Sequence, residues 1–349
     1  MRLLRLFLLL TSVVILTTGH GLAAARIAKF IVTGAAATQP TGIILSGTIV
    51  GYYLDSEFSA HGFLRNISGS ITTFDVPGAS EGDHLGTFAN AINDAGEVAG
   101  TYSGSDLSWH GCLRDTSGNI TTFDVPGETM SGNTYGPQGI NDAGQVVGIS
   151  RGATTGDVFT MQADGTFSIF TPGGGNAAYV GINSLGEVAG TYSDTTERAY
   201  HGFFIDTSDN ITTFDVPGAI GTQPGYGTWA YSLNDSGVIA GFWVDTNFTG
   251  HGYLRKPSGV IVSYNVPGTT TFGGGTYINS AGTVVSTSFT DTHSNPIWAP
   301  FIRNHAGNIT SVEVPDTDEA IATGINQSGE ICGFFAGQKG VTYAFLRTP

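Results

Sequence analysis

The sequence is poor in charge, in cations and in sulfur. Only 12% of the 349 residues are charged, and 13 Lys and Arg stand against 28 Asp and Glu, which gives a formal net charge of −15. An acidic surface repels phosphate backbones, so we expect no nucleic-acid partner. There are 3 Met and 2 Cys in the whole chain.

Long apolar runs are confined to the N-terminus. Arg2 and Arg5 precede an apolar stretch from Leu6 to Leu16, and the small residues 23–25 follow it. This order is typical of a secretory signal with its cleavage site, and the apolar stretch falls short of the roughly 20 residues that cross a bilayer. We therefore interpret residues 1–25 as a signal peptide and 26–349 as one domain. We expect no membrane span and a secreted or periplasmic location.

The two cysteines, Cys112 and Cys332, could form a disulfide after export. Both take the place of buried apolar residues in the repeats described below: Cys112 aligns with Phe63, and Cys332 aligns with Ala99. The two positions also fall in non-adjacent repeats. We predict two unpaired, buried thiols that act as small apolar residues.

No stretch after residue 25 has helical periodicity, whereas 52 residues are Gly and turn-forming residues are abundant. Two markers recur instead. The first is an Ile/Leu-Asn-x-x-Gly turn at 92–96, 140–144, 182–186, 233–237, 278–282 and 325–329. The second is a "VPG", or a close variant of it, that ends at Gly78, Gly127, Gly173, Gly218, Gly268 and Asp316. A spacing of about 40–50 residues is typical of propeller blades.

Each repeat contains four short extended segments. In the second repeat they are 88–94, 97–103, 109–115 and 119–125, and we name such segments A, B, C and D. They are rich in β-branched and aromatic residues, and Gly, Asn, Asp or Ser bounds each of them. Four antiparallel strands repeated about an axis are the plan of a β-propeller.

The two ends of the chain complement each other. The last repeat ends at Pro349 directly after segment C, and so lacks segment D. "IAKFIVTG" at 27–34 resembles the D segment "ITTFDVPG" but has no A, B or C in front of it. Segment C occurs seven times along the chain. We therefore predict an all-β, seven-bladed β-propeller with four antiparallel strands per blade, closed by the N-terminal strand that completes the last blade.

Four stretches combine with the Asn-x-x-Gly turns into a recognisable pattern: "HGFLR" (61–65), "HGFFI" (201–205), "HGYLR" (251–255) and "YAFLR" (343–347). This pattern resembles the bacterial extracellular HAF-repeat proteins, with His-Gly-Phe in place of His-Ala-Phe. The resemblance covers nearly all of the chain after residue 25 and implies an exported β-propeller. It implies no reaction. The third and sixth repeats depart from the pattern, with "DVFTM" and "APFIR".

Several polar and aromatic residues recur at one position per repeat. The histidines His61, His110, His201 and His251 would lie one blade apart, too far for a shared metal ion, so we favour a repeated structural hydrogen bond. Aromatic residues at Tyr53, Tyr102, Tyr192, Trp243 and Phe335 could stack on sugars or pack blades together, and we favour packing. We expect Asp75, Asp124 and Asp215 to form hydrogen bonds at turns or strand ends.

Recognition is expected where the repeat breaks. The short A–B and C–D turns share one face, so the longer D–A and B–C loops emerge together on the other. Unrepeated reactive or stacking residues in these loops are the candidate ligand-binding residues: Asp83, His84, Glu128, Tyr135, Glu197, Tyr226, Trp229, Asp291, His293 and Trp298.

Two functions fit these loops. The favoured one is a non-catalytic exported propeller, a monomer, that binds an extracellular carbohydrate, cell-surface polymer or protein. The alternative is a polysaccharide hydrolase or lyase whose acids and histidines lie on the same face. Whether the chain is an enzyme stays open, because no diagnostic catalytic motif is present. We expect no metal and no cofactor.

Overall fold

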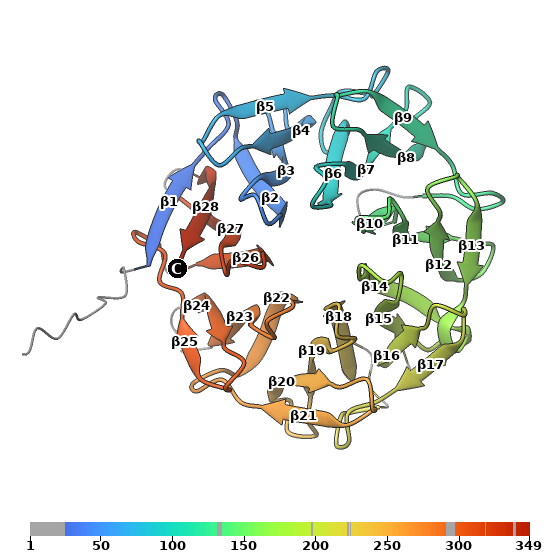
Figure 1. Cartoon of the computed structure of the whole chain (residues 1–349), viewed down its shortest axis with the longest axis vertical. Coiled ribbons are helices and arrows are strands. Elements are labelled where there is room, and N and C mark those ends of the chain that lie inside the picture. The colour runs from blue at the N-terminus through green and yellow to red at the C-terminus, as the bar shows by residue number, and fades with distance from the viewer. Residues whose placement is uncertain are drawn as a thin grey trace, which may run out of the picture.

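The computed structural model describes residues 25–130, 135–196, 198–221, 223, 225–290, 297–317, 319–337 and 340–349. Residues 1–24 of the expected signal peptide lie outside this part. Short antiparallel sheets are set around a common axis, with the first strand of each sheet innermost and the last at the rim (Figure 1). No helix in the described residues is long and apolar enough to cross a membrane.

Five four-stranded sheets stand apart from one another in the described part of the chain. The second repeat forms β6 (Thr87–Ile92), β7 (Val98–Ser103), β8 (Trp109–Arg114) and β9 (Ile120–Phe123). The third forms β10 (Pro137–Ile140), β11 (Val146–Arg151), β12 (Gly156–Met161) and β13 (Phe167–Phe170), followed by the 3₁₀ turn η1 (Pro172–Gly174). The fourth forms β14 (Asn176–Ile182), β15 (Val188–Ser193), β16 (Tyr200–Ile205) and β17 (Ile211–Phe214). The fifth and sixth form β18 (Thr228–Leu233), β19 (Ile239–Val244), β20 (Gly250–Arg255), β21 (Ile261–Tyr264), β22 (Thr271–Ile278), β23 (Val284–Thr290), β24 (Ile297–Arg303) and β25 (Ile309–Ser311).

The remaining strands come from both ends of the chain. β2 (Ala37–Ile43), β3 (Ile49–Leu54), β4 (Ala60–Arg65) and β5 (Ile71–Phe74) form one antiparallel run, and β26 (Ala320–Ile325), β27 (Ile331–Ala336) and β28 (Thr342–Thr348) form another. A single parallel residue pair, Ala37 with Thr342, joins the two runs. β1 (Arg26–Phe30) pairs antiparallel with β28 and places Lys29 opposite Phe345.

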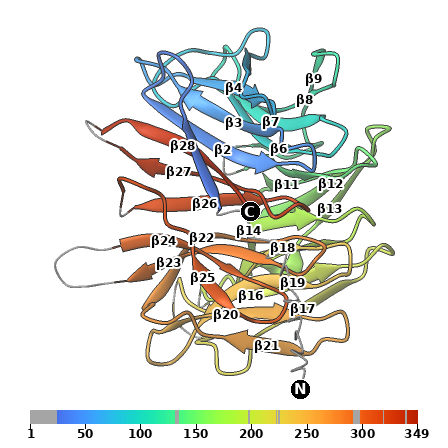
Figure 2. The same cartoon turned by 60° about the vertical axis from the view of Figure 1, so that its left-hand side comes forward.

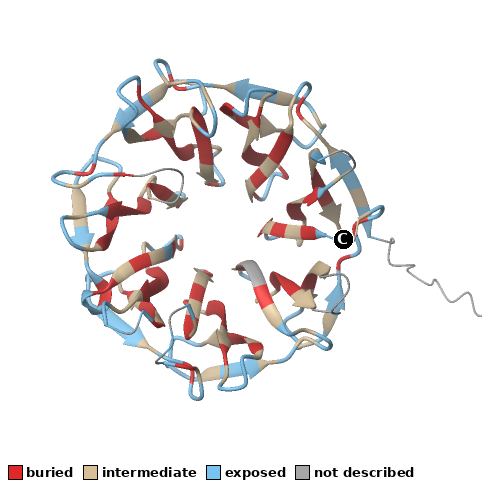
Figure 3. Cartoon of the chain, turned by 180° about the vertical axis from the view of Figure 1, so that it is seen from behind, coloured by how far each residue is buried: buried red, intermediate tan, exposed pale blue. Residues whose placement is uncertain are grey.

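The strands follow the predicted segments closely. In the second repeat the observed strands begin and end within two residues of the predicted ones, and the predicted all-β class with four-stranded antiparallel sheets is confirmed. The molecule is a thick disc when turned (Figure 2). Inner and middle strands are mostly buried, whereas the outermost strands and the turns are exposed (Figure 3).

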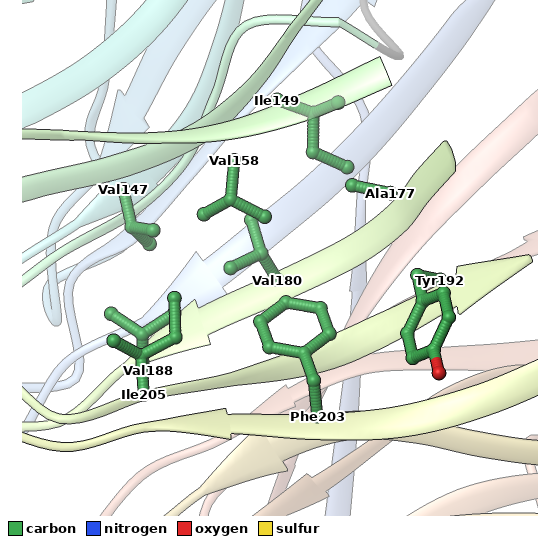
Figure 4. Close-up of a cluster of buried hydrophobic side chains, with 9 residues drawn as sticks. All are labelled: Val147, Ile149, Val158, Ala177, Val180, Val188, Tyr192, Phe203 and Ile205. Carbon is green, nitrogen blue, oxygen red and sulfur yellow. The ribbon is translucent and has the colours of Figure 1, made fainter. Parts of the chain in front are cut away.

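Apolar side chains pack between neighbouring sheets. Figure 4 shows one such cluster, where Val147 and Val158 of the third sheet face Val188 and Phe203 of the fourth. Each of these side chains is at most 1% exposed, and burying one such side chain contributes roughly 1.5–3 kcal/mol. The two cysteines are also buried and unpaired, as predicted. Burial raises the pKa of both thiols to about 12, so they stay protonated and unreactive.

The His-Gly dipeptide has a steric origin. A Cβ atom on Gly202 would lie 2.4 Å from the Phe214 ring, which covers this glycine from the last strand of the sheet. The same clash would occur between Gly111 and Phe123. Glycine at this position therefore lets the outer aromatic ring lie flat against strand C.

A side-chain amide in six of the A–B turns connects one sheet to the next, whereas the turn of the first sheet has Ile44 at this position. Nδ2 of Asn93 donates to the Asn141 carbonyl oxygen at 3.0 Å, and the same bond recurs around the disc. The donors that form it are Asn93, Asn141, Asn183, Asn234, Asn279 and Asn326. The last of them, Asn326, donates to Ile44 of the first sheet at 2.9 Å.

An arginine at the end of strand C forms a second contact between sheets. Arg114 lies over the Phe74 ring of the preceding sheet at 5.1 Å, and Arg255 lies over Phe214 at 4.8 Å. Arg65 of the first sheet lies over Phe30 of β1, also at 4.8 Å. Phe30 also meets Phe63 at 6.3 Å and 75°, the geometry of Phe214 against Tyr253.

We predict that Asn234→Asp destabilises the fold by about 2–4 kcal/mol. Its side-chain oxygen would still accept the Ser236 and Val238 amides, but the buried carboxylate could no longer donate to the Asn279 carbonyl. The measurement is the free energy of unfolding in urea.

The matched control is Asn304→Asp in an exposed C–D turn. Asn304 accepts the Asn308 amide in the same way, and the equivalent residues Asp115 and Asp206 are already acidic. We expect a change within about 0.5 kcal/mol. Equal losses for the two variants would contradict a specific role for donation to the next sheet.

Candidate functional site

The inner strands surround a cavity of about 810 Å³ that lies along the axis of the disc. Its walls come from β2, β6, β10, β14, β18, β22 and β26. We call the end formed by the A–B turns the turn mouth. The other end, where these strands begin and the D–A and B–C loops emerge, is the loop mouth.

The turn mouth is acidic, but its carboxylates are occupied. Asp94, Asp142 and Asp235 are the only ionisable side chains, apart from tyrosines, among the described residues that line the cavity. Each accepts a backbone N–H from the adjacent turn, as Asp142 does from Asp94. Burial alone would raise the pKa of Asp235, but hydrogen bonds from Ser184 and Ser280 hold it below the usual range. These acids stabilise the turns.

At the loop mouth, the described residues that line the cavity are polar but uncharged. Amide side chains line it at Gln39, Asn90 and Gln138. Tyr52 donates to Gln39 Oε1 at 2.5 Å, and Asn90 Nδ2 donates to the Pro137 carbonyl of the next sheet at 3.0 Å. These bonds hold the amides in fixed positions, which suits recognition of a hydrogen-bonding ligand.

Aromatic side chains form a patch at one side of the loop mouth, comprising Tyr179, Tyr200, Trp229 and Tyr231. Tyr179 and Tyr231 line the cavity, with ring centroids 4.6 Å apart. Trp229 lies 5.8 Å from Tyr179 and 3.7 Å from Tyr200, which extends the patch outward from β14 and β18 to β16. Tyr179 is 41% exposed, so its ring is open to a ligand. We refer to these four residues as the aromatic patch.

The repeated histidines each lie between two polar side chains of their own sheet. In the fourth sheet, His201 Nδ1 is 3.0 Å from Asp215 Oδ1, and Nε2 is 3.3 Å from Asp194 Oδ2. Equivalent bridges occur at His61, His110 and His251. At His251 the partner of Nδ1 is Asn265 in place of an aspartate, and at His110 the partner of Nε2 is Ser108. The predicted structural hydrogen bond is confirmed, and Asp75, Asp124 and Asp215 are its partners.

The recurring aromatic residues of strand B stack on these histidines. Tyr192 lies 5.1 Å from His201 at an interplanar angle of 29°. Tyr192 also belongs to the cluster between the third and fourth sheets (Figure 4), which agrees with the predicted packing role. The alignment of the repeats did not predict this contact with histidine.

An acid pair replaces the histidine in the third sheet. Asp157 stands at the histidine position, is 6% exposed, and accepts a 2.6 Å bond from the Thr171 hydroxyl. Glu128 from the D–A loop lies beside it and accepts a short bond from Ser150. Burial, and then the neighbouring Asp157 charge, raise the pKa of Glu128. The pKa of Glu128, near the loop mouth, therefore lies above that of an ordinary glutamate.

The predicted ligand-binding residues that the structure describes do not form one site. Asp83 and His84 pair with each other at 3.6 Å on an exposed loop. Tyr226 packs on Phe248, and Trp298 packs on Phe289. Glu197, Asp291 and His293 lie outside the described residues.

Three of the predicted residues that the structure describes lie in or beside the aromatic patch, among them Tyr226, whose carbonyl oxygen accepts the Tyr200 amide at 2.8 Å. Trp229 belongs to it, and Tyr135 is close enough to interact electrostatically with Tyr200. Tyr179 and Tyr231 were not predicted, because the candidate ligand-binding residues came from the loops and these two lie on the inner strands β14 and β18. A large aromatic residue in segment A, the inner strand of a repeat, would have indicated both tyrosines in the sequence.

No protein-family model matches this chain, and no curated protein matches it either. Solved structures do. An inactive variant of virginiamycin B lyase from Staphylococcus aureus with quinupristin aligns at a TM-score of 0.64 with 14% identity, over 93% of this chain and 99% of that one. The β-propeller domain of the Trilobed protease from Pyrococcus furiosus aligns at 0.60 with 8% identity, over 90% and 94%.

Oligogalacturonate lyase from Vibrio parahaemolyticus aligns at a TM-score of 0.56 with 10% identity, over 93% of this chain and 96% of that one. These likenesses establish the β-propeller fold. At such low identity they carry no activity over to this chain.

We predict that His201 makes stability depend on pH. Its hydrogen bond to Asp215, opposed by burial, raises the pKa of His201 above the usual 6.5. The protonated histidine therefore contributes stability that is fully present below about pH 6.5 and is lost as pH rises through the folded-state pKa. The measurement is the free energy of unfolding between pH 5.5 and 8.5.

Asp215→Asn is the matched variant, because it copies the His251–Asn265 pair of the fifth sheet. We expect it to weaken the loss of stability in this pH range. An unchanged pH profile in both Asp215→Asn and His201→Gln would contradict the assignment.

Proposed function

We propose that this chain is an exported seven-bladed β-propeller of the HAF-repeat type that binds an extracellular ligand at its loop mouth without transforming it. The ligand classes considered are a carbohydrate, a cell-surface polymer or a protein. A monomer and a secreted or periplasmic location, after removal of residues 1–25, are part of the proposal.

Contacts between the chain ends support seven blades in a closed circle. Counting β26–β28 with β1 as one blade and β2–β5 as another adds two to the five separate sheets. The bonds across this seam are those that join the other blades: Asn326 donates to Ile44, and Arg65 lies over Phe30. Val32 N donates to Thr38 at 3.0 Å, as Val76 N does to Thr87 and Val216 N to Thr228.

The observation that carries the binding function is the chemistry of the loop mouth. Its described lining offers amides, hydroxyls, phenols and open ring faces. Burial raises the pKa of Tyr52 and raises that of Tyr231 further, so these phenols stay protonated near neutral pH. Such groups hold and orient a ligand, but they are poorly suited to exchange protons with it.

A second candidate function rests on Glu128 and Asp157. A glutamate whose pKa is raised could act as a general acid in a polysaccharide hydrolase or lyase. Against this, the two carboxyl groups are close enough to hydrogen-bond each other, whereas glycosidases hold theirs at least about 5 Å apart around the sugar bond. Asp157 also accepts hydrogen bonds from Thr155 and Thr171, as a structural residue would.

The test is incubation of the purified protein with a panel of polysaccharides, glycoproteins and cell-envelope polymers. We expect one of these classes to be retained on the immobilised protein and recovered at its original chain length. Release of new reducing ends or of unsaturated sugars would contradict the proposal. If this turnover were abolished in Glu128→Gln, the second candidate function would replace it.

A further inference from the structure

The loop mouth combines ring faces and amides in a space of ligand size. It opens into the axial cavity, whose volume of about 810 Å³ falls within the roughly 300–1,000 Å³ of small-molecule sites. Gln39, Asn90 and Gln138 come from three successive sheets, and Tyr179 and Tyr231 come from the next two. A ligand in this space would meet hydrogen-bonding groups on one side and aromatic faces on the other.

The charge of the residues that line the cavity limits the kinds of ligand that it can bind. The described residues that line the cavity include no Lys, Arg or His, so nothing in that lining would neutralise a carboxylate, sulfate or phosphate. The nearest fixed charges along the cavity are Asp94, Asp142 and Asp235, which would repel an anion. These acids would attract a cation, but they lie at the turn mouth, at the other end of the cavity from the aromatic patch.

The aromatic patch indicates the ligand class more closely. Sugar rings have an apolar face of C–H groups and a rim of hydroxyls, so they stack on aromatic side chains while bonding to nearby amides. Tyr179 presents such a face at the cavity rim. The patch then continues outward through Trp229 to Tyr200, away from the axis. This radial extension fits an elongated ligand better than a single small molecule.

We infer that the loop mouth binds an uncharged oligosaccharide or polysaccharide chain, with one sugar ring stacked on Tyr179 and the chain continuing along Trp229 and Tyr200. The inference rests on the binding function proposed above and names its ligand class. Peptides share the neutral character, but they lack the repeated hydroxyl rims that would meet the amides of Gln39 and Asn90.

The experiment is affinity electrophoresis and titration calorimetry with neutral β-glucan, mannan and xylan, and with the anionic polymers polygalacturonate and heparin. We expect at least one neutral polymer to bind, with an affinity that changes less than about twofold between 50 and 500 mM NaCl, because no ion pair forms. Tyr179→Ala should weaken this binding at least about tenfold, whereas Tyr179→Phe, which keeps the ring, should stay within about threefold.

Leu185→Ala is the matched control. Leu185 is 60% exposed on the A–B turn of the same sheet, so it tests the loss of an exposed apolar side chain at the turn mouth. We expect its affinity to equal that of the unaltered protein. Far-ultraviolet circular dichroism and melting temperature would show that each variant folds.

Several outcomes would overturn the inference. Binding of the anionic polymers with strong salt dependence, or neutral-polymer binding that survives Tyr179→Ala, would place the ligand elsewhere. Retention of proteins but of no glycan would reject the carbohydrate class while leaving a binding function intact. Cleavage of a bound glycan would instead reject the non-catalytic function and keep the ligand class.

Discussion

The side-chain amide of the A–B turn asparagine, present in six of the repeats, is the interaction on which the fold depends. Its oxygen accepts backbone amides of its own A–B turn, and its nitrogen donates to the carbonyl of the next sheet. A buried amide can do both, whereas an ionised aspartate can only accept and leucine can do neither. The bond therefore couples the shape of each turn to the position of its neighbour. A chain with little charge and no disulfide can join separate small sheets into one body in this way.

This arrangement divides the disc into two unequal faces. At the turn mouth, amide and carboxylate side chains form hydrogen bonds with the neighbouring turns. Substitution of these side chains is therefore expected to lower the stability of the fold. At the loop mouth, the sheets are already held in place, and residues can vary at low cost to stability. The aromatic patch and the Glu128–Asp157 pair lie on this second face, where they break the repeat. The contacts that stabilise the fold and the proposed recognition site thus lie at opposite ends of one cavity.

The sequence predicted strands well and contacts between strands poorly. The Asn-x-x-Gly and "VPG" markers place each strand, because turn geometry is a local property of the chain. The partner of His201 was not visible, since Asp215 becomes its neighbour only when the hairpin β16–β17 pairs. Tyr179 was missed for a related reason: β14 has a bulge between Ala177 and Tyr179, and alternation along the strand does not indicate which side chains reach the cavity. Trp229 and Glu128 were found because they interrupt the repeat in loops or at their edges.

Native-state hydrogen exchange tests the central claim, that the contacts that join neighbouring sheets also join the two chain ends. The comparison is between the protected amides of β1, which holds Phe30, and those of β9, the equivalent outer strand in the second repeat. The account predicts that both strands exchange through the same global opening, with free energies within about 1 kcal/mol of each other. Exchange of β1 at a much lower free energy, while β9 stays protected, would show that the chain ends are not joined and would contradict it.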